Sequence, residues 1–225
     1  DPADLLEREL MPDYEVGPLL ASDSFNRADG AIGSTDGGIL GPLAYQADGA
    51  TSLASWEIAG NKAQSNHAGT ALQPIWIDVG VSDYRIEIEV AALPGFVANI
   101  GVVGRYVDRS SLIWWGVNES GTLTPQRLYL QQRPTTADVD AINLVGPIGG
   151  LTAPGDVITV DFWGSDVYIY KNGSPLADVH GITFNQTATK VGLWGNKDGT
   201  GALDNFKVWQ LDPVLPELTH TGAMT

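Results

Sequence analysis

Apolar and polar residues alternate along much of this chain, which is the pattern of β-strands that bury one face. The clearest case is YRIEIEV, residues 84–90, where every second side chain is apolar and those between are charged. A period of two predicts a strand with one face in a core and one in water. From about Leu20 onward the chain therefore reads as β-structure.

A second stretch, Ile158 to Val179, predicts three antiparallel strands in succession. Gly164-Ser165 marks the first turn and Asn172-Gly173 the second. Asn-Gly is a strong hairpin signal because both central residues of a type I′ turn need a positive φ. Further strands are predicted at 62–64, 71–79, 99–106, 111–117, 127–132, 190–194 and 202–210, separated by loops rich in Gly and Asp. Many short strands without intervening helices indicate a two-sheet sandwich.

The two ends differ from this pattern. DPADLLERELM, residues 1–11, predicts a short helix, since Asp1 suits a cap and Pro2 the first helical position. The last stretch contains Pro213 and Pro216 and predicts an extended tail. The expected organisation is a helical arm over 1–19, one sandwich domain over 20–210 and a tail over 211–225.

Composition supports one all-β domain and excludes several functions. The chain has 225 residues, 43% of them hydrophobic, with seven Trp and a formal net charge of −15. That acidic balance argues against binding nucleic acid phosphates or an anionic membrane surface, and no apolar run is long enough to insert in a membrane. The absence of cysteine excludes disulfides, thiolate metal sites and cysteine nucleophiles.

Several blocks, taken in order, resemble the concanavalin A-like (laminin-G-like) jelly-roll superfamily, as found in phage tail and bacterial surface modules. They are DSFNRADGAIGSTDGG (23–38), WEIAGNKAQS (56–65), IGVVGRYVDRSSLIWWGV (100–117), the hairpin ending in KNG (171–173), VGLWGN (191–196) and LDNFKV (203–208). The resemblance implies an all-β, two-sheet antiparallel jelly-roll sandwich. It does not imply one activity, because this fold hosts lectins, binding modules, glycosidases and structural domains.

Adjacent tryptophans give the first candidate site, for a sugar. Neighbouring residues of a strand point to opposite faces, so Trp115 should share the inward face of Ile113 and Trp114 should point outward. An exposed aromatic ring binds the apolar side of a pyranose. The expected glycan-binding residues are Trp114, Trp194, Asn196, Arg105, Tyr106 and Tyr129. The alternative is that these aromatic side chains belong to the core or to a subunit interface.

Calcium is the second candidate ligand, and it follows from the resemblance. In sandwiches of this type the first and last strands lie side by side, often joined by a calcium ion. Asp23 and Asp204 would then supply the carboxylates, since Ca²⁺ takes oxygen ligands. The alternative is that both residues cap turns by accepting backbone N–H bonds.

Glycoside hydrolysis is the third possibility, since it needs two carboxylates about 5–10 Å apart. Laminarinase-like members of the superfamily carry E-x-D-x-x-E on one strand, and here only Glu87 and Glu89 match. The alternative is that both form the solvated face of a strand. His67, His180 and His220 are scattered, without the spacing of metal ligands.

The sequence therefore predicts a non-catalytic module that binds a cell-surface glycan, on a bacteriophage virion or a bacterial surface. Its terminal arms would contact other virion subunits or further copies of the chain. Two alternatives stay open: a structural virion protein without a ligand, and a laminarinase-like glycosidase.

Overall fold

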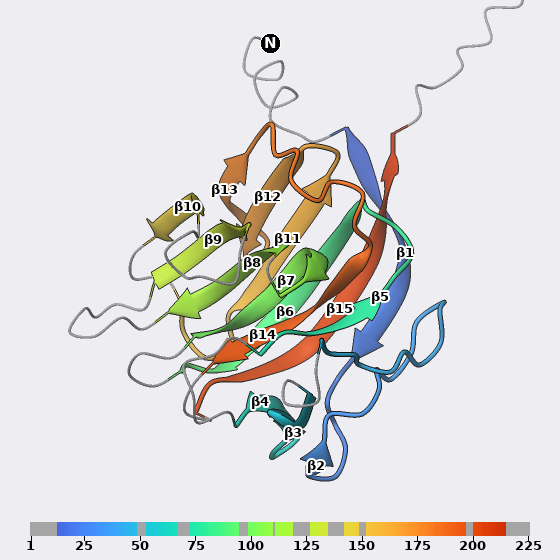
Figure 1. The fold of residues 1–225 in the computed structure, drawn as a ribbon, viewed down its shortest axis with the longest axis vertical. Coiled ribbons are helices and arrows are strands. Elements are labelled where there is room, and N and C mark those ends of the chain that lie inside the picture. Colours follow the sequence, from blue (N-terminus) through green and yellow to red (C-terminus); the bar gives the residue numbers. More distant parts are fainter. Residues whose placement is uncertain are drawn as a thin grey trace, which may run out of the picture.

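Two antiparallel sheets stack face to face in the computed structural model (Figure 1). The structure describes residues 13–48, 53–66, 73–94, 99–109, 111–118, 127–134, 142–148, 152–196 and 200–214. The helix predicted over 1–11 and the tail predicted beyond 214 lie outside these residues. Within the described ranges, no helix has the length and apolar character needed to cross a membrane.

The larger sheet has nine strands, in the order β13-β12-β11-β6-β15-β4-β3-β2, with β1 paired to β15. Its strands are β1 (Tyr14–Asp23), β2 (Gly30–Ala31), β3 (Trp56–Ile58), β4 (Ala63–Ser65), β6 (Tyr84–Ala92), β11 (Val157–Trp163), β12 (Asp166–Lys171), β13 (Ser174–Val179) and β15 (Ala202–Pro213). The smaller sheet has six strands, in the order β10-β9-β8-β7-β14-β5. They are β5 (Ile75–Asp78), β7 (Asn99–Asp108), β8 (Ser111–Asn118), β9 (Arg127–Arg133), β10 (Ile142–Ile148) and β14 (Lys190–Asn196).

The alternating pattern of β6 builds the core as predicted. Its apolar residues are buried and the charged residues between them are half-buried. In register with β11, Ile88 lies opposite Ile158 and Ile86 opposite Val160, so these side chains point together between the sheets. The three-stranded meander is confirmed, and its second turn has the expected backbone: φ is 51° at Asn172 and 77° at Gly173.

The first and last strands lie side by side, as the resemblance implied (Figure 1). Their pairing runs from Tyr14 opposite Pro213 to Asp23 opposite Phe206. The sandwich therefore includes residues 14–19 and 211–213, which the sequence analysis assigned to the arm and the tail. The sequence pattern places the start of the β-structure near Leu20 and Pro213 in an extended tail, so it underestimates both strands. The structure includes Pro18 in β1. Pro lacks an N–H, but the N-terminal half of β1 is an edge, where that donor is not needed.

Candidate functional site

The two adjacent tryptophans of β8 point to opposite faces of the six-stranded sheet, as predicted. Trp115 belongs to the core between the sheets. Trp114 belongs to a second apolar cluster, on the outer face of the same sheet. Gly116 makes room for it, since a Cβ at this position would lie 2.7 Å from the Trp114 ring.

Five aromatic side chains gather on this outer face, and we call them the outer aromatic cluster. Tyr106, Trp114 and Trp194 are buried within it, and Trp76 and Tyr129 are half-buried against them. The rings of Trp114 and Trp194 stack at 5.1 Å between centroids and 19° between planes. The predicted residues Tyr106, Trp114, Tyr129 and Trp194 thus lie together.

The expected exposure of the two tryptophans is wrong. Trp114 is 5% exposed and Trp194 is 1% exposed, because each ring covers the other. The accessible part of the cluster is therefore its rim, Trp76 and Tyr129.

A carboxylate on the loop after β2 joins two rings of the cluster. Asp48 accepts a hydrogen bond from the Tyr106 hydroxyl at 2.6 Å and one from the Trp76 indole nitrogen at 3.3 Å. Burial, followed by this bond to Asp48, raises the pKa of Tyr106, so its hydroxyl stays protonated and donates. The two rings stack at 6.2 Å, which gives the cluster a fixed shape.

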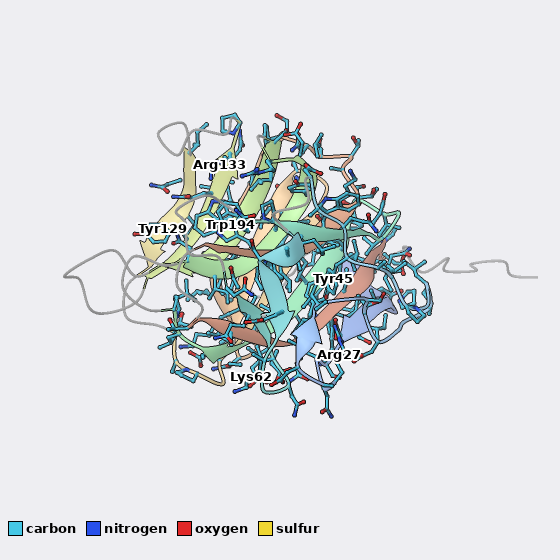
Figure 2. The ribbon with its side chains drawn as sticks, turned by 60° about the horizontal axis from the view of Figure 1, so that its bottom comes forward. Arg27, Tyr45, Lys62, Tyr129, Arg133 and Trp194 are labelled. Atoms are coloured by element: carbon cyan, nitrogen blue, oxygen red, sulfur yellow. The ribbon has the colours of Figure 1, made fainter. Side chains whose placement is uncertain are left out.

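Two cations complete the outer aromatic cluster. The guanidinium of Arg133 lies 5.8 Å from the centroid of Trp194, and the ammonium of Lys190 lies 4.0 Å from that of Trp76. Figure 2 shows Arg133, Trp194 and Tyr129 close together in this view. Among the described residues the buried indole N–H of Trp194 has no hydrogen-bond partner, and the same holds for the indole N–H of Trp115 between the sheets.

Arg105 is not on this surface, contrary to the prediction. It is fully buried, and its guanidinium donates to the backbone carbonyls of Gly164 and Ile182 and lies 5.3 Å from the Phe162 ring centroid. The cause is a bulge in β7, where Arg105 takes a φ of 48° and the register shifts. The extra residue turns Arg105 inward and Tyr106 outward. Asn196 ends β14, and its side chain lies outside the description.

The carboxylates expected to bind calcium are engaged elsewhere. Asp23 is fully buried, and both of its oxygens accept hydrogen bonds from Arg27, at 2.6 and 3.0 Å. It also accepts the Phe25 N–H, and Asp204 accepts the Asn205 N–H, each at 2.8 Å. In the described part of the chain, no three His, Asp or Glu side chains gather to hold a metal. The arrangement does not fit calcium, because Arg27 already supplies the positive charge at Asp23.

The carboxylates considered for hydrolysis are also paired. Glu87 forms an ion pair with Lys207 at 2.8 Å, and Glu89 accepts a hydrogen bond from Asn205 at 2.8 Å. Both project from the outer face of the nine-stranded sheet. Of the histidines, His180 forms ion pairs with Asp166 and Asp178, whereas His67 and His220 lie outside the described residues.

One ring of the outer aromatic cluster was missed, Trp76, and so were the three charged residues around the cluster, Asp48, Arg133 and Lys190. Trp76 could have been found, because Ile75 and Ile77 point inward and alternation then places Trp76 outside. The sequence carries no comparable signal for Arg133 or Asp48, since only the fold brings β9 and the loop at 48 to the same face.

The comparisons with known proteins agree on the fold. No protein-family model matches the chain, and no curated protein matches its sequence. Among solved structures, the carbohydrate recognition domain of Emp47p is similar at a TM-score of 0.53 and 10% identity, over 88% of this chain and 98% of that one. The GH43 protein BlXynB of Bacillus licheniformis is similar at 0.53 and 11% identity, over 86% of this chain and 39% of that one.

A xylan β-1,4-xylosidase of Bacillus halodurans is similar at 0.50 and 13% identity, over 90% of this chain and 41% of that one. The chain thus spans about two fifths of each of these two GH43 chains. At such identities the likeness concerns architecture alone. The protein has a concanavalin A-like β-sandwich fold.

Proposed function

We propose that this protein is a non-catalytic carbohydrate-binding module that recognises a cell-surface glycan through the outer aromatic cluster. The observation that carries the proposal is the accessible aromatic rim of Trp76 and Tyr129, which packs against the buried rings of Tyr106, Trp114 and Trp194. A sugar ring is the complementary group, because its apolar face packs on aromatic carbon while its hydroxyls form hydrogen bonds at the edge of the rings. The similar fold of the Emp47p carbohydrate recognition domain supports this class of ligand.

The geometry of the rim suits the apolar face of a sugar ring. Tyr129 and Trp76 present half-buried aromatic surface, and the stacked pair of Trp114 and Trp194 supports them from behind. A rigid aromatic surface loses little entropy on binding. Glu87 and Glu89, the residues considered for hydrolysis, lie on the other sheet, where Glu87 pairs with Lys207 and Glu89 accepts a hydrogen bond from Asn205. This arrangement favours glycan binding without turnover. As the setting we propose a bacteriophage virion or a bacterial surface.

The sharpest test weakens the support of the rim and leaves the rim residues in place. Trp194→Phe removes the five-membered ring of the indole and with it part of the stack on Trp114. Trp115→Phe is the matched control, because Trp115 is also buried but lies between the sheets. Both variants should lose similar thermal stability. An aromatic pair contributes about 0.5–1.5 kcal/mol beyond its buried area, so Trp194→Phe should weaken glycan binding about two- to tenfold while Trp115→Phe leaves it unchanged.

Binding is measured against an array of immobilised bacterial polysaccharides and then by calorimetry with the best oligosaccharide. A Tyr129→Ala variant tests the rim and should weaken binding further, because it removes exposed aromatic surface. Equal binding by wild type, Trp194→Phe and Tyr129→Ala would refute this surface. Loss of a defined oligomer in Tyr129→Ala, without any glycan bound by wild type, would favour the structural virion protein.

A further inference from the structure

A pocket lies at one end of the sandwich, and none of its lining residues belongs to the outer aromatic cluster. Its volume is about 460 Å³. It is lined by the loop between β5 and β6, the end of β11, the segment before β14 and the end of β15. Its lining includes Asp83, Trp163, Thr187, Gln210 and Asp212.

The aromatic wall of this pocket is held in place from behind. Trp163 is half-buried, and its ring packs on Tyr14 at 5.3 Å between centroids. The Tyr14 hydroxyl donates to Asp161, which is fully buried and binds Arg85 through two hydrogen bonds of 2.6 and 2.7 Å. Burial, followed by the charge of Asp161, raises the pKa of Tyr14 and keeps it a donor. The indole is therefore fixed before any ligand arrives.

The polar groups of the pocket are mainly acceptors with capacity to spare. Asp83 accepts the Gly164 N–H at 2.8 Å, and Asp212 accepts from Gln210 at 2.6 Å. One hydrogen bond occupies a fraction of the roughly four acceptor positions of an ionised carboxylate. The hydroxyl of Thr187 adds a donor at the exposed side. An aromatic wall facing carboxylates is suited to a ligand that is apolar on one side and carries many O–H donors.

The charges of the pocket lining narrow the class of ligand further. The pocket is lined by two carboxylates and by no Lys or Arg of the described chain. An acidic sugar would bring its carboxylate against Asp83 and Asp212, where like charges repel. We propose that this pocket is a second saccharide site, which binds a neutral, hydroxyl-rich sugar unit against Trp163. The proposal rests on the proposed function only in taking the ligand to be a saccharide.

The test compares two tryptophans of the same sheet. Trp163→Ala removes the wall of the pocket. Trp209→Ala is the matched control, since Trp209 is also half-buried and does not line the pocket. The probes are neutral xylohexaose, cellohexaose and chitohexaose and acidic hexagalacturonate, measured by calorimetry. Trp163→Ala should lower the number of bound neutral chains or weaken one class of site at least tenfold, and Trp209→Ala should leave both unchanged.

Asp212→Asn covers the case in which Trp163→Ala fails to fold, because it keeps the shape of the side chain. It should weaken binding at the same class of site several-fold and lower the ratio of the affinities for neutral and acidic probes. Equal effects of Trp163→Ala and Trp209→Ala would overturn the second site. So would binding of hexagalacturonate that Trp163→Ala weakens as much as it weakens binding of the neutral chains. If Trp194→Phe alone weakens binding, the pocket is refuted as a saccharide site and the proposed function stands. Loss in Trp163→Ala alone would keep the pocket and refute the outer aromatic cluster as a site.

Discussion

Replacing Arg27 tests whether an arginine, and not a metal, supplies the positive charge at Asp23. In Arg27→Met the apolar stem remains and the guanidinium is lost. Asp23 is fully buried, and Arg27 has a side chain only 28% exposed. The variant therefore leaves a buried carboxylate with one backbone N–H, from Phe25, in place of its charged partner. Leaving one member of a buried ion pair alone costs about 3–5 kcal/mol.

Because Arg27 keeps some contact with water, we expect the lower end, about 3 kcal/mol. For a domain of this size each kcal/mol shifts Tm by about 2–4 °C, so Tm should fall by about 6–12 °C at pH 7. Burial already raises the pKa of Asp23 against the opposing effect of Arg27. Without Arg27 that pKa rises further, so the neutral acid forms more readily and the loss in Tm should shrink as the pH is lowered toward 4.

Scanning calorimetry over a pH series measures this, with Asp36→Asn as the control. Asp36 lies 3.5 Å from Arg27, its side chain is 45% exposed, and it accepts hydrogen bonds from the N–H and the hydroxyl of Ser24. The oxygen of an asparagine can still accept these bonds, so the loss of the charge alone should cost less than about 1 kcal/mol. An unchanged Tm in Arg27→Met would refute the argument. A rise in the wild-type Tm with millimolar calcium that is absent from Asp23→Asn would also refute it, since calcium would then bind at Asp23 in spite of Arg27.

Three further predictions concern separate features. The pKa of His180 is raised, first because of its hydrogen bond to Asp166. A raised histidine pKa stabilises the fold below about pH 6.5, and this stabilisation is lost as the pH rises through the raised value. His180→Gln should therefore lower Tm at pH 5 and not at pH 9. Gly173→Ala puts a side chain at a φ of 77° with open space around it, and urea unfolding should show a loss of about 1 kcal/mol from backbone strain alone. Glu89→Gln should leave glycan binding unchanged, and reducing-sugar assays should detect no turnover in either protein; turnover abolished by this change would establish the glycosidase.

Regular alternation explains why much of the fold could be predicted. The meander and the opposite facing of Trp114 and Trp115 depend only on a period of two and on turn residues that need a positive φ. Both are local properties, so neither needs knowledge of distant contacts. The order of strands is a different matter, because β15 lies between β6 and β1, and no local pattern encodes that pairing.

The site was predicted less well, for two physical reasons. A bulge at Arg105 adds a residue to β7, so the side chains that follow it point to the opposite faces of the sheet from those that alternation predicts. Arginine is not a residue whose presence indicates a positive φ, so the sequence does not reveal the bulge. Burial of Trp194 arises from Trp114 and from Arg133, which belong to two other strands. Alternation gives the face on which a side chain lies, whereas its exposure depends on what covers that face.

The placement of the cations bears on the ligand of both proposed sites. With 12 Lys and Arg against 27 Asp and Glu, the chain has few positive charges, and several are committed to internal partners. Arg27 and Arg85 neutralise buried carboxylates, and Arg105 is buried on backbone carbonyls. Arg133 and Lys190 lie over aromatic rings. At the outer aromatic cluster Arg133 and Lys190 keep their positive charges, so charge does not exclude an acidic glycan there. At the pocket beside Trp163 no Lys or Arg of the described chain is part of the lining, so an anionic glycan would face Asp83 and Asp212 without a cation. A neutral saccharide needs only aromatic surface and hydrogen-bonding groups, and it is therefore the ligand that the distribution of charge favours at the pocket.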